Sequence, residues 1–286
     1  MVLERAWGPP FYARGRRGPV ACGMIRFMEE PALPAIHQPP RRPHAWAWSL
    51  VASQLLVVAL WWRMGWRVGL PLLLLSHLVF VWGTLRPDSA LFGPVLSRLP
   101  TREPVVWLTI DDGPSDDTQA ILDALDARGA KATFFVVASR ARAHPELVRE
   151  IVRRGHGLGN HSDSHPSAWF WALGPRRMAR EIADAQSTLH DIAGQSPRWF
   201  RAVVGMANPF VAAPLARLGL ARVAWSARGY DAVDGDAARV VARIERDLAP
   251  GAIVLLHEGA AHGRSVETVT ALLDRLDARG FRTVLP

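Results

Sequence analysis

Two adjacent carboxylates follow an apolar run near the middle of the chain. Residues 105–114 read VVWLTIDDGP, so a segment of strand length ends in Asp111 and Asp112 before a Gly-Pro pair turns the backbone. Beside such a turn both carboxylates can face one cleft at the carboxyl end of the strand, where they repel each other unless a cation lies between them. The pair indicates a site for a cation or for proton transfer, the alternative being that one Asp only caps the following helix.

Two histidines four residues apart occur in the segment 159–166, GNHSDSHP. Residues at this spacing share one face of a helical turn, so His161 and His165 can bind one metal ion. Taken alone, the pair could equally be two exposed loop residues. Together with a carboxylate from another strand end, however, the two imidazoles give three ligands and open positions, which is the pattern of a catalytic rather than a structural metal site.

The elements that must position these residues alternate between strand and helix patterns from residue 105 onward. Strands are expected at 105–110, 132–137, 198–201, 220–225, 252–256 and 281–285, with a short one before residue 160. Helices are expected at 117–128, 145–154, 174–193, 209–218, 236–248 and 265–279. Such repeats predict an α/β fold with a parallel sheet covered by helices, and about seven strands predict a closed or nearly closed barrel.

Barrels of this class place their chemistry at the carboxyl ends of the strands. Five polar residues lie at or just beyond the expected strand ends: Asp111, Asp112, His161, Arg201 and His257. The sequence therefore predicts that the two acids and the two histidines of the HSDSH segment close on the same divalent ion.

Two long apolar segments precede this region. Residues 45–62 contain no charged residue, and residues 68–85 contain none apart from the titratable His77, each near the ~20 residues that span a bilayer. Six of the 12 tryptophans gather toward the two ends of the implied hairpin, as in interfacial aromatic belts: Trp46, Trp48 and Trp82 at one end, Trp61, Trp62 and Trp66 at the other. The pattern predicts a transmembrane helical hairpin over 45–85, in preference to a buried soluble hairpin or a signal peptide, which would show a cleavage site.

The remaining boundaries follow from composition. Residues 1–44 are rich in arginine, proline and glycine without an apolar period, which predicts a disordered segment, and 86–103 reads as a linker. Arg41 and Arg42 before the first span favour a two-pass protein of the bacterial inner membrane with its catalytic domain in the cytoplasm, although Arg63 and Arg67 in the turn partly offset that bias.

The charge and cysteine content exclude other classes. The formal net charge is +8, yet only one of the 34 basic residues is a lysine, and the arginines are scattered rather than arranged in a stripe. We therefore expect no nucleic-acid partner. Cys22 is the only cysteine, which excludes an intramolecular disulfide and a cysteine-rich zinc site.

Three motifs in order resemble the polysaccharide deacetylases with a NodB-homology domain, carbohydrate esterase family 4, over about residues 104–285. TIDDGP resembles the first family motif, which implies that Asp111 is the general base and Asp112 a metal ligand. HSDSH resembles the second, which implies that His161 and His165 are ligands, and LLHEG resembles the fifth, which points to His257 as the catalytic histidine. The resemblance implies a distorted (β/α) barrel.

Two further motifs depart from the family pattern. In FRAVVG, Arg201 stands at the arginine that orients the base in the family, but Val203 replaces a proline and Val204 an aromatic residue. The family takes its oxyanion donor from the backbone N–H of the residue at the Val204 position, and Val204 retains that N–H. In WSARGYDAV, Arg228 stands at the first acid, Asp231 at the second, and an alanine where the family has tryptophan. An arginine near His257 disfavours the protonated imidazole unless Asp231 neutralises it.

The resemblance implies a metal-dependent N-deacetylase for an N-acetylated carbohydrate: a GlcNAc-type glycan, peptidoglycan or a lipid-linked saccharide. The cofactor is expected to be Zn²⁺, with Co²⁺ or Ni²⁺ as alternatives. Two other functions stay open: a catalytically impaired membrane-tethered barrel that binds a glycan, and an amidohydrolase for a non-sugar acetamide. Glu258 is expected at the solvated rim, and four other histidines at the surface or in loops: His144, His156, His190 and His262.

Overall fold

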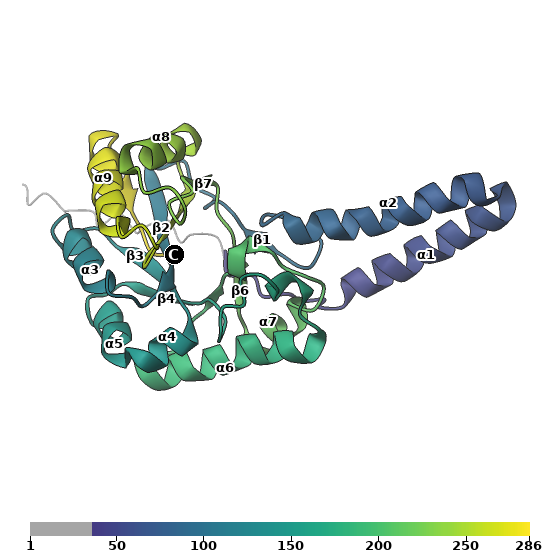
Figure 1. Cartoon of the computed structure of the whole chain (residues 1–286), viewed down its shortest axis with the longest axis horizontal. Coiled ribbons are helices and arrows are strands. Elements are labelled where there is room, and N and C mark those ends of the chain that lie inside the picture. The colour runs from purple at the N-terminus through teal and green to yellow at the C-terminus, as the bar shows by residue number, and fades with distance from the viewer. Residues whose placement is uncertain (1–35) are drawn as a thin grey trace, which may run out of the picture. The chain divides into compact units, whose positions relative to one another are not determined.

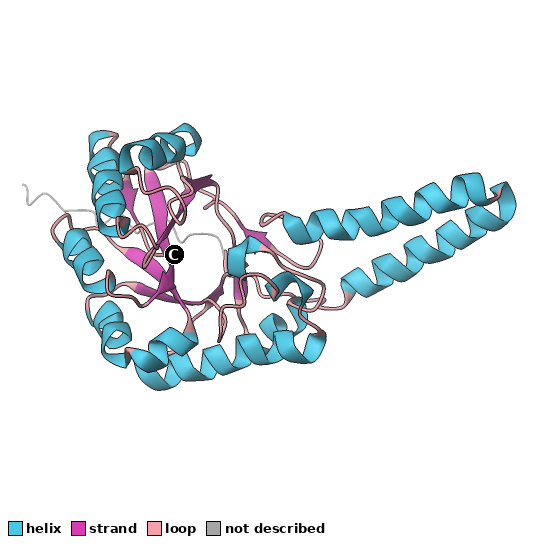
Figure 2. Cartoon of the chain, in the orientation of Figure 1, coloured by secondary structure: helices cyan, strands magenta, loops and turns pink. Residues whose placement is uncertain are grey.

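A computed structural model of the chain describes residues 36–286. In this part the helices surround a sheet of parallel strands (Figures 1 and 2). The strands are β1 Val95–Leu96, β2 Val105–Gly113, β3 Ala132–Val136, β4 Gly157–Asn160, β5 Trp199–Phe200, β6 Ala221–Val223, β7 Ala227–Arg228, β8 Ala252–His257 and β9 Arg282–Thr283. The helices are α1 Ala45–Met64, α2 Trp66–Leu85, α3 Thr118–Asp126, α4 Ala138–Ala143, α5 Pro145–Arg153, α6 Pro175–Ala193, α7 Ala212–Leu218, α8 Ala237–Asp247 and α9 Ser265–Ala278, with 3₁₀ turns η1 Phe170–Ala172 and η2 Val203–Gly205.

The strand order is β1-β6-β5-β4-β3-β2-β8-β7, with β9 paired to β2. Every pair of strands in this sheet is parallel. β1 and β7 stand at the two ends of the order, and no ladder among the described residues joins them. The predicted parallel α/β barrel is therefore confirmed as a curled sheet that stays open on one side.

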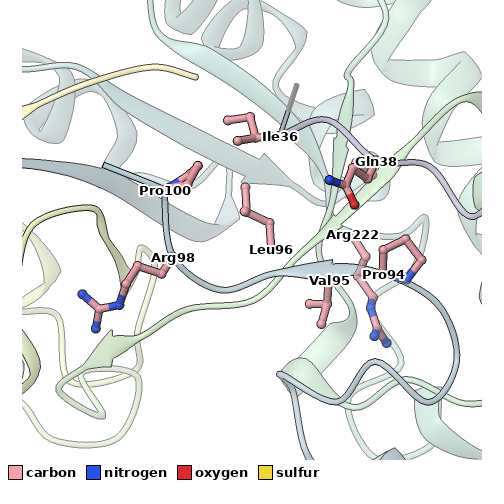
Figure 3. A pocket seen from close by; sticks show the side chains of 9 residues that line it. Ile36, Gln38, Pro94, Val95, Leu96, Arg98, Pro100 and Arg222 are labelled. Carbon is pink, nitrogen blue, oxygen red and sulfur yellow. The ribbon is translucent and has the colours of Figure 1, made fainter. Parts of the chain in front are cut away.

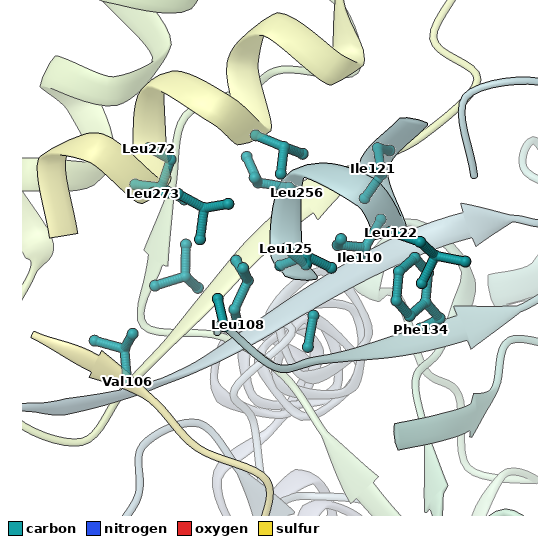
Figure 4. Packing of buried hydrophobic residues seen from close by; sticks show 14 of the residues in the cluster. Val106, Leu108, Ile110, Ile121, Leu122, Leu125, Phe134, Leu256, Leu272 and Leu273 are labelled. Carbon is teal, nitrogen blue, oxygen red and sulfur yellow. The ribbon is translucent and has the colours of Figure 1, made fainter. Parts of the chain in front are cut away.

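The central strand β2 is buried on both faces, which explains its continuous apolar run. Alternate side chains point to opposite faces. Val106, Leu108 and Ile110 pack outward against α3 and α9 in the largest buried cluster (Figure 4). Trp107 points to the other face, where it packs with Phe135 and other residues inside the curled sheet. β2 is thus anchored from both sides, and its carboxyl end is held rigidly.

Helix α6 shows why the sequence pattern located the longer helices. Proline opens it, Gly194 closes it in the left-handed region at φ 69°, and the buried residues recur at helical spacing. The short elements were missed. α4 has the sequence ASRARA, which carries no extended apolar face, and β1 and β7 have only two residues each.

The segment 86–103 is part of the folded domain, so the prediction that it is a linker is wrong. Its strand β1 pairs with β6, Arg98 forms an isolated bridge with Ala252, and Phe92 and Leu99 are buried. Because the segment is rich in proline and its strand has only two residues, its sequence shows no hydrophobic period from which this role could be predicted.

The predicted disordered segment 1–44 falls mostly outside the described residues. Residues 36–44 form no helix or strand, yet they lie against the domain. Ile36 packs on the inner cluster, and the His37 ring meets Trp199 edge-on at 5.2 Å between centroids. Composition could not foresee these contacts, because they depend on a surface formed by distant strands.

Helices α1 and α2 coincide with the two predicted spans and are long and apolar enough to cross a membrane. Only 6% of the apolar window of α1 and 11% of that of α2 is buried. A core helix of a water-soluble protein would instead bury its apolar side chains. Gly65, at φ 81°, forms the turn between the helices, and Gln54 Nε2 donates to Ser76 Oγ across them at 3.1 Å. Their location in a membrane stays a prediction.

Candidate active site

The sheet brings the predicted site residues to one edge. Register pairs Asp111 of β2 with His257 of β8, so the base and the acid suggested by the motifs lie on adjacent strands. β4 and β5 end side by side, directly before His161 and Arg201. The carboxyl ends of parallel strands lie at the same edge of the sheet, so residues far apart in the sequence meet there.

Asp112, His161 and His165 form one cluster. Asp112 Oδ1 lies 3.4 Å from His161 Nε2 and 2.9 Å from His165 Nε2. One potential ligand atom from each residue lies within 4.8 Å of the other two. The structure thus brings together the three residues that the sequence predicted as a ligand set.

The donor set fits a cation. Asp112 Oδ1 is buried and has no hydrogen-bond partner within residues 36–286. His161 Nδ1 donates to the Arg201 carbonyl at 2.9 Å, which leaves the lone pair of Nε2 for a metal. Burial raises the pKa of Asp112, but the two imidazoles beside its Oδ1 outweigh burial and hold this pKa well below its ordinary value. The carboxylate is therefore ionised at neutral pH.

The histidine loop is held by buried polar groups. Asn160 Oδ1 accepts the N–H of Ser162 at 3.0 Å, while its amide donates to Gln186 at 3.1 Å and to a carbonyl of α6. Glu181 accepts both the N–H and the hydroxyl of Ser164, at 2.9 and 2.7 Å. These contacts fix the loop between the two histidines, so ion binding would not have to order it.

Backbone strain is concentrated in this region. Left-handed φ angles outside glycine cost free energy and gather at functional sites. Among the described residues the non-glycine positions with positive φ all fall in the motif segments of the predicted site: Asp112, Ser162, His165, Val204 and Tyr230. The fold sustains strained conformations in the same loops that carry the candidate chemistry.

Asp111 is held by a buried arginine. Its Oδ1 lies 2.7 Å from Arg201 Nη1, and both side chains are almost fully buried. Arg201 also donates to Thr109 Oγ1 at 2.8 Å and lies 4.2 Å from the ring centroid of Phe135, so it cannot move away. Asp111 Oδ2 is 3.8 Å from His161 Nε2 and faces the ligand cluster. One oxygen is thus fixed while the other is turned toward the reaction centre.

His257 is paired with Asp231. Asp231 Oδ1 lies 3.1 Å from His257 Nδ1, and Oδ2 accepts the His257 backbone N–H at 2.6 Å. Burial lowers the pKa of His257, but the hydrogen bond and charge of Asp231 outweigh it, so the pKa is raised overall. Asp231 therefore supports the imidazolium. His262 Nε2 lies 2.6 Å from the backbone carbonyl oxygen of the same Asp231.

Val204 lies in the turn η2 directly after the Arg201 strand. Its φ is 55°, and no hydrogen bond from its N–H is found within the described part of the chain. Its side chain is 52% exposed, so it does not fill the barrel. The Val204 N–H is therefore without a hydrogen-bond partner in the described part of the chain, and its role as oxyanion donor stays a prediction.

Comparison with known proteins agrees with this geometry. The family model described as polysaccharide deacetylase matches residues 98–223. A chitooligosaccharide deacetylase of Bradyrhizobium sp. (strain ANU 289) is 34% identical over 62% of this chain and 86% of that protein. This chain belongs to the polysaccharide deacetylase family. A peptidoglycan-N-acetylglucosamine deacetylase of Listeria monocytogenes is 32% identical over 63% of this chain and 37% of that protein.

Solved structures of polysaccharide deacetylases have the same fold. The Bc1960 peptidoglycan N-acetylglucosamine deacetylase superposes with a TM-score of 0.62 at 28% identity, covering 66% of this chain and 89% of that one. The family 4 carbohydrate esterase of Streptomyces lividans gives 0.59 at 30% identity, covering 65% and 94%. The predicted fold, family and enzyme class are confirmed: this polysaccharide deacetylase is a hydrolase of N-acetyl amide bonds.

The sequence argument misplaced Glu258 of this deacetylase. The expected rim carboxylate is only 1% exposed, and burial raises its pKa to about 7. It accepts hydrogen bonds from Ser115 Oγ, at 2.8 Å, and from Thr118 Oγ1. A Cβ at Gly113 would lie 1.9 Å from its carboxylate, so only glycine fits there. Glu258 thus connects the end of β8 to the turn that follows Asp111 and Asp112. Glu258 and Ser115 are 143 positions apart in the sequence, so no local pattern predicts their contact.

The four remaining histidines divide into two groups. His144 and His190 are exposed, as predicted. His156 is buried, and burial lowers its pKa to about 4, while His262 contacts the Asp231 carbonyl as described above. His156 lies in the loop between α5 and β4, which agrees with the prediction, but it is not at the surface, because its ring packs edge-on against Phe134 in the core.

A cavity of about 380 Å³ lies beside β1 and β6 (Figure 3). It is lined by Ile36, Gln38, Pro94, Val95, Leu96, Arg98, Pro100, Ala221 and Arg222. None of the candidate site residues lines it. The guanidinium of Arg222 instead donates to the carbonyls of Ser89 and Gly93, which ties the segment after α2 to β6.

The pH profile tests the pairing of His257 with Asp231. An acid that must be protonated loses activity as pH rises through its pKa, and Asp231 raises that pKa. Asp231→Asn removes the charge while burial remains, so the alkaline limb of kcat should move to lower pH and kcat should fall. The measurement is kcat for acetate release against pH. An unchanged alkaline limb would show that His257 does not depend on Asp231.

Proposed function

We propose that this protein is a metal-dependent N-deacetylase that hydrolyses the acetamide of a GlcNAc-type sugar. The observation that carries the proposal is the meeting of three groups at one edge of the sheet: the Asp112, His161 and His165 cluster, the Asp111–Arg201 pair and the Asp231–His257 pair. Relatives named as chitooligosaccharide and peptidoglycan deacetylases support this substrate class.

Asp112, His161 and His165 would hold a divalent cation, with zinc as the first candidate and cobalt or nickel as alternatives. Bound there, the cation would supply Lewis acidity to the acetamide carbonyl and to the attacking water. Two observations support this assignment: Asp112 Oδ1 has no hydrogen-bond partner among the described residues, and the tautomer of His161 is fixed.

The proton transfers fall to the two held pairs. Asp111, fixed through one oxygen by Arg201, takes the proton from the water that adds to the acetyl carbon. The N–H of Val204 donates to the carbonyl oxygen as negative charge develops on it. His257, whose pKa is raised by Asp231, gives its proton to the nitrogen as the C–N bond breaks. The products are acetate and a free amino sugar.

The hairpin α1–α2 supports a two-pass membrane anchor. Its exposed apolar side chains need an apolar environment, and exposed patches of this size are uncommon on water-soluble monomers. We place the catalytic domain on the cytoplasmic side, from Arg41 and Arg42 before α1. A fluorescent reporter fused after Pro286 should be active and an alkaline phosphatase fusion inactive. The reverse result would put the domain on the outer side.

The activity test uses purified full-length protein with chitooligosaccharides and with peptidoglycan fragments. Acetate and free amine should appear in equal amounts, disappear after chelation and return on addition of Zn²⁺, Co²⁺ or Ni²⁺. Binding of these glycans without acetate release would support instead the impaired glycan-binding barrel that Val203 and Arg228 suggest. Acetate release from simple acetamides alone would support the non-sugar amidohydrolase.

A further inference from the structure

Arg228 faces the reaction centre. β7 and β8 pair Arg228 with Leu255, two residues before His257. Side chains two apart on a strand point to the same face, and paired residues of neighbouring strands share that face. Arg228 therefore lies on the inner face of the curled sheet, one side-chain layer below His257.

Within residues 36–286, the guanidinium of Arg228 stacks on aromatic rings and has no ion-pair partner. It lies 4.1 Å from the ring centroid of Tyr230 and 5.2 Å from that of Trp225. Its Nε is buried with no hydrogen-bond partner, and no ion pair to it is found within residues 36–286. Asp231, the adjacent acid, is engaged by His257 through both oxygens. A partly buried cation without a counter-charge is costly, so this arrangement is poised for an anion.

The same aromatic ring links Arg228 to the rest of the site. Arg201 lies 5.8 Å from the Trp225 centroid. Gly205, directly after Val204, is packed so closely that a Cβ would lie 2.5 Å from Trp225 and 2.8 Å from Pro87. Arg228 and the turn that carries the Val204 N–H therefore contact the same Trp225 ring.

Pro87 also connects this turn with the hairpin. α2 ends at Leu85, only two residues earlier, and Arg86 lies 6.0 Å from the Trp82 ring at that helix end. If α2 spans the bilayer, its end lies at the headgroup level, where tryptophan and arginine are typical. The site would then open close to the membrane surface.

We propose that Arg228 forms an anion-binding subsite and that the substrate is an N-acetylated sugar carrying a phosphate or carboxylate next to the reacting ring. This inference rests on the proposed deacetylase function. The planar guanidinium provides paired donors that match either anion, and its two stacking partners hold it in place. A neutral sugar has no negative charge that could pair with the Arg228 guanidinium. A phosphate-linked lipid would also place its sugar at the hairpin end.

Three substrates distinguish the sources of the anion. Tetra-N-acetylchitotetraose is neutral, GlcNAc-MurNAc carries a carboxylate, and farnesyl-phosphate-linked N-acetylglucosamine carries a phosphate. For the wild type, kcat/KM should favour at least one anionic substrate over the neutral one. Arg228→Gln should lower that ratio by about 10- to 100-fold, the range of a charge-assisted hydrogen bond, mainly through KM. Arg228→Lys should keep part of the preference for the anionic substrate. In the wild type this preference should decrease with added salt.

Arg217→Gln is the matched control, because it removes an exposed arginine on α7 outside the site and should leave the ratio unchanged. A wild-type preference for the neutral substrate, or an unchanged ratio in Arg228→Gln, would overturn the subsite. Acetate from none of the substrates would instead contradict the deacetylase function itself.

A second measurement needs no variant that could misfold. Methyl phosphate should inhibit wild-type turnover of tetra-N-acetylchitotetraose competitively, compared with chloride at equal ionic strength. Equal rates with methyl phosphate and chloride would contradict the proposal independently of Arg228→Gln.

Discussion

Asp111→Asn should lower kcat for acetate release by about 10²- to 10⁴-fold, the usual contribution of a positioned general base. The amide cannot take a proton from the attacking water, although its oxygen can still accept the hydrogen bond from Arg201. The ligand cluster of Asp112 and the two histidines is untouched, so bound metal should stay at the wild-type level. The measurement is steady-state acetate release, together with metal content of the same samples.

Asp163→Asn is the control for this experiment. It also converts one aspartate to asparagine in a site motif, but Asp163 is paired with the exposed Arg142 at 2.7 Å and is not one of the three clustered residues. Its activity should stay near that of the wild type. Equal activity of wild type and Asp111→Asn would remove Asp111 as the base. If both retained metal and released no acetate, the glycan-binding alternative would stand.

His161→Ala should lose bound metal, with an affinity reduced by more than about 100-fold, because even groups that only orient a ligand contribute 10- to 100-fold. His161 is the most deeply buried residue of the proposed ligand set, its tautomer is fixed by the Arg201 carbonyl, and it also faces Asp111. Activity should fall with the metal. Metal content after dialysis and a zinc titration measure the effect.

His144→Ala serves as the comparison for this variant, since His144 is exposed and 3.7 Å from Glu146, outside the cluster. It should keep metal and activity. Stoichiometric metal in His161→Ala, with circular dichroism like that of the wild type, would contradict the proposed ligand set. A loss of folded signal in His161→Ala alone would call for His165→Ala, whose side chain is more exposed.

The sequence determined the long elements and named the candidate site residues that the structure brings together. β2 could be recognised because it is apolar on both faces and ends in Asp111, Asp112 and a Gly-Pro turn. α6 could be recognised from its caps and its periodic buried face. The motif residues could be named because each motif is a local stretch whose spacing is set by one turn or one strand end.

Only the tertiary structure decided how these residues are paired and which of them are buried. Asp231 bonds His257 rather than Arg228, and Glu258 is buried against Ser115 instead of lying at the rim. Strand β1, within the apparent linker, completes one end of the sheet. Such contacts join residues 26 to 143 positions apart, and strand register, not local spacing, brings them together. The inward orientation of Arg228 likewise emerges only once β7 is paired with β8, because that register turns its side chain toward the face that carries His257.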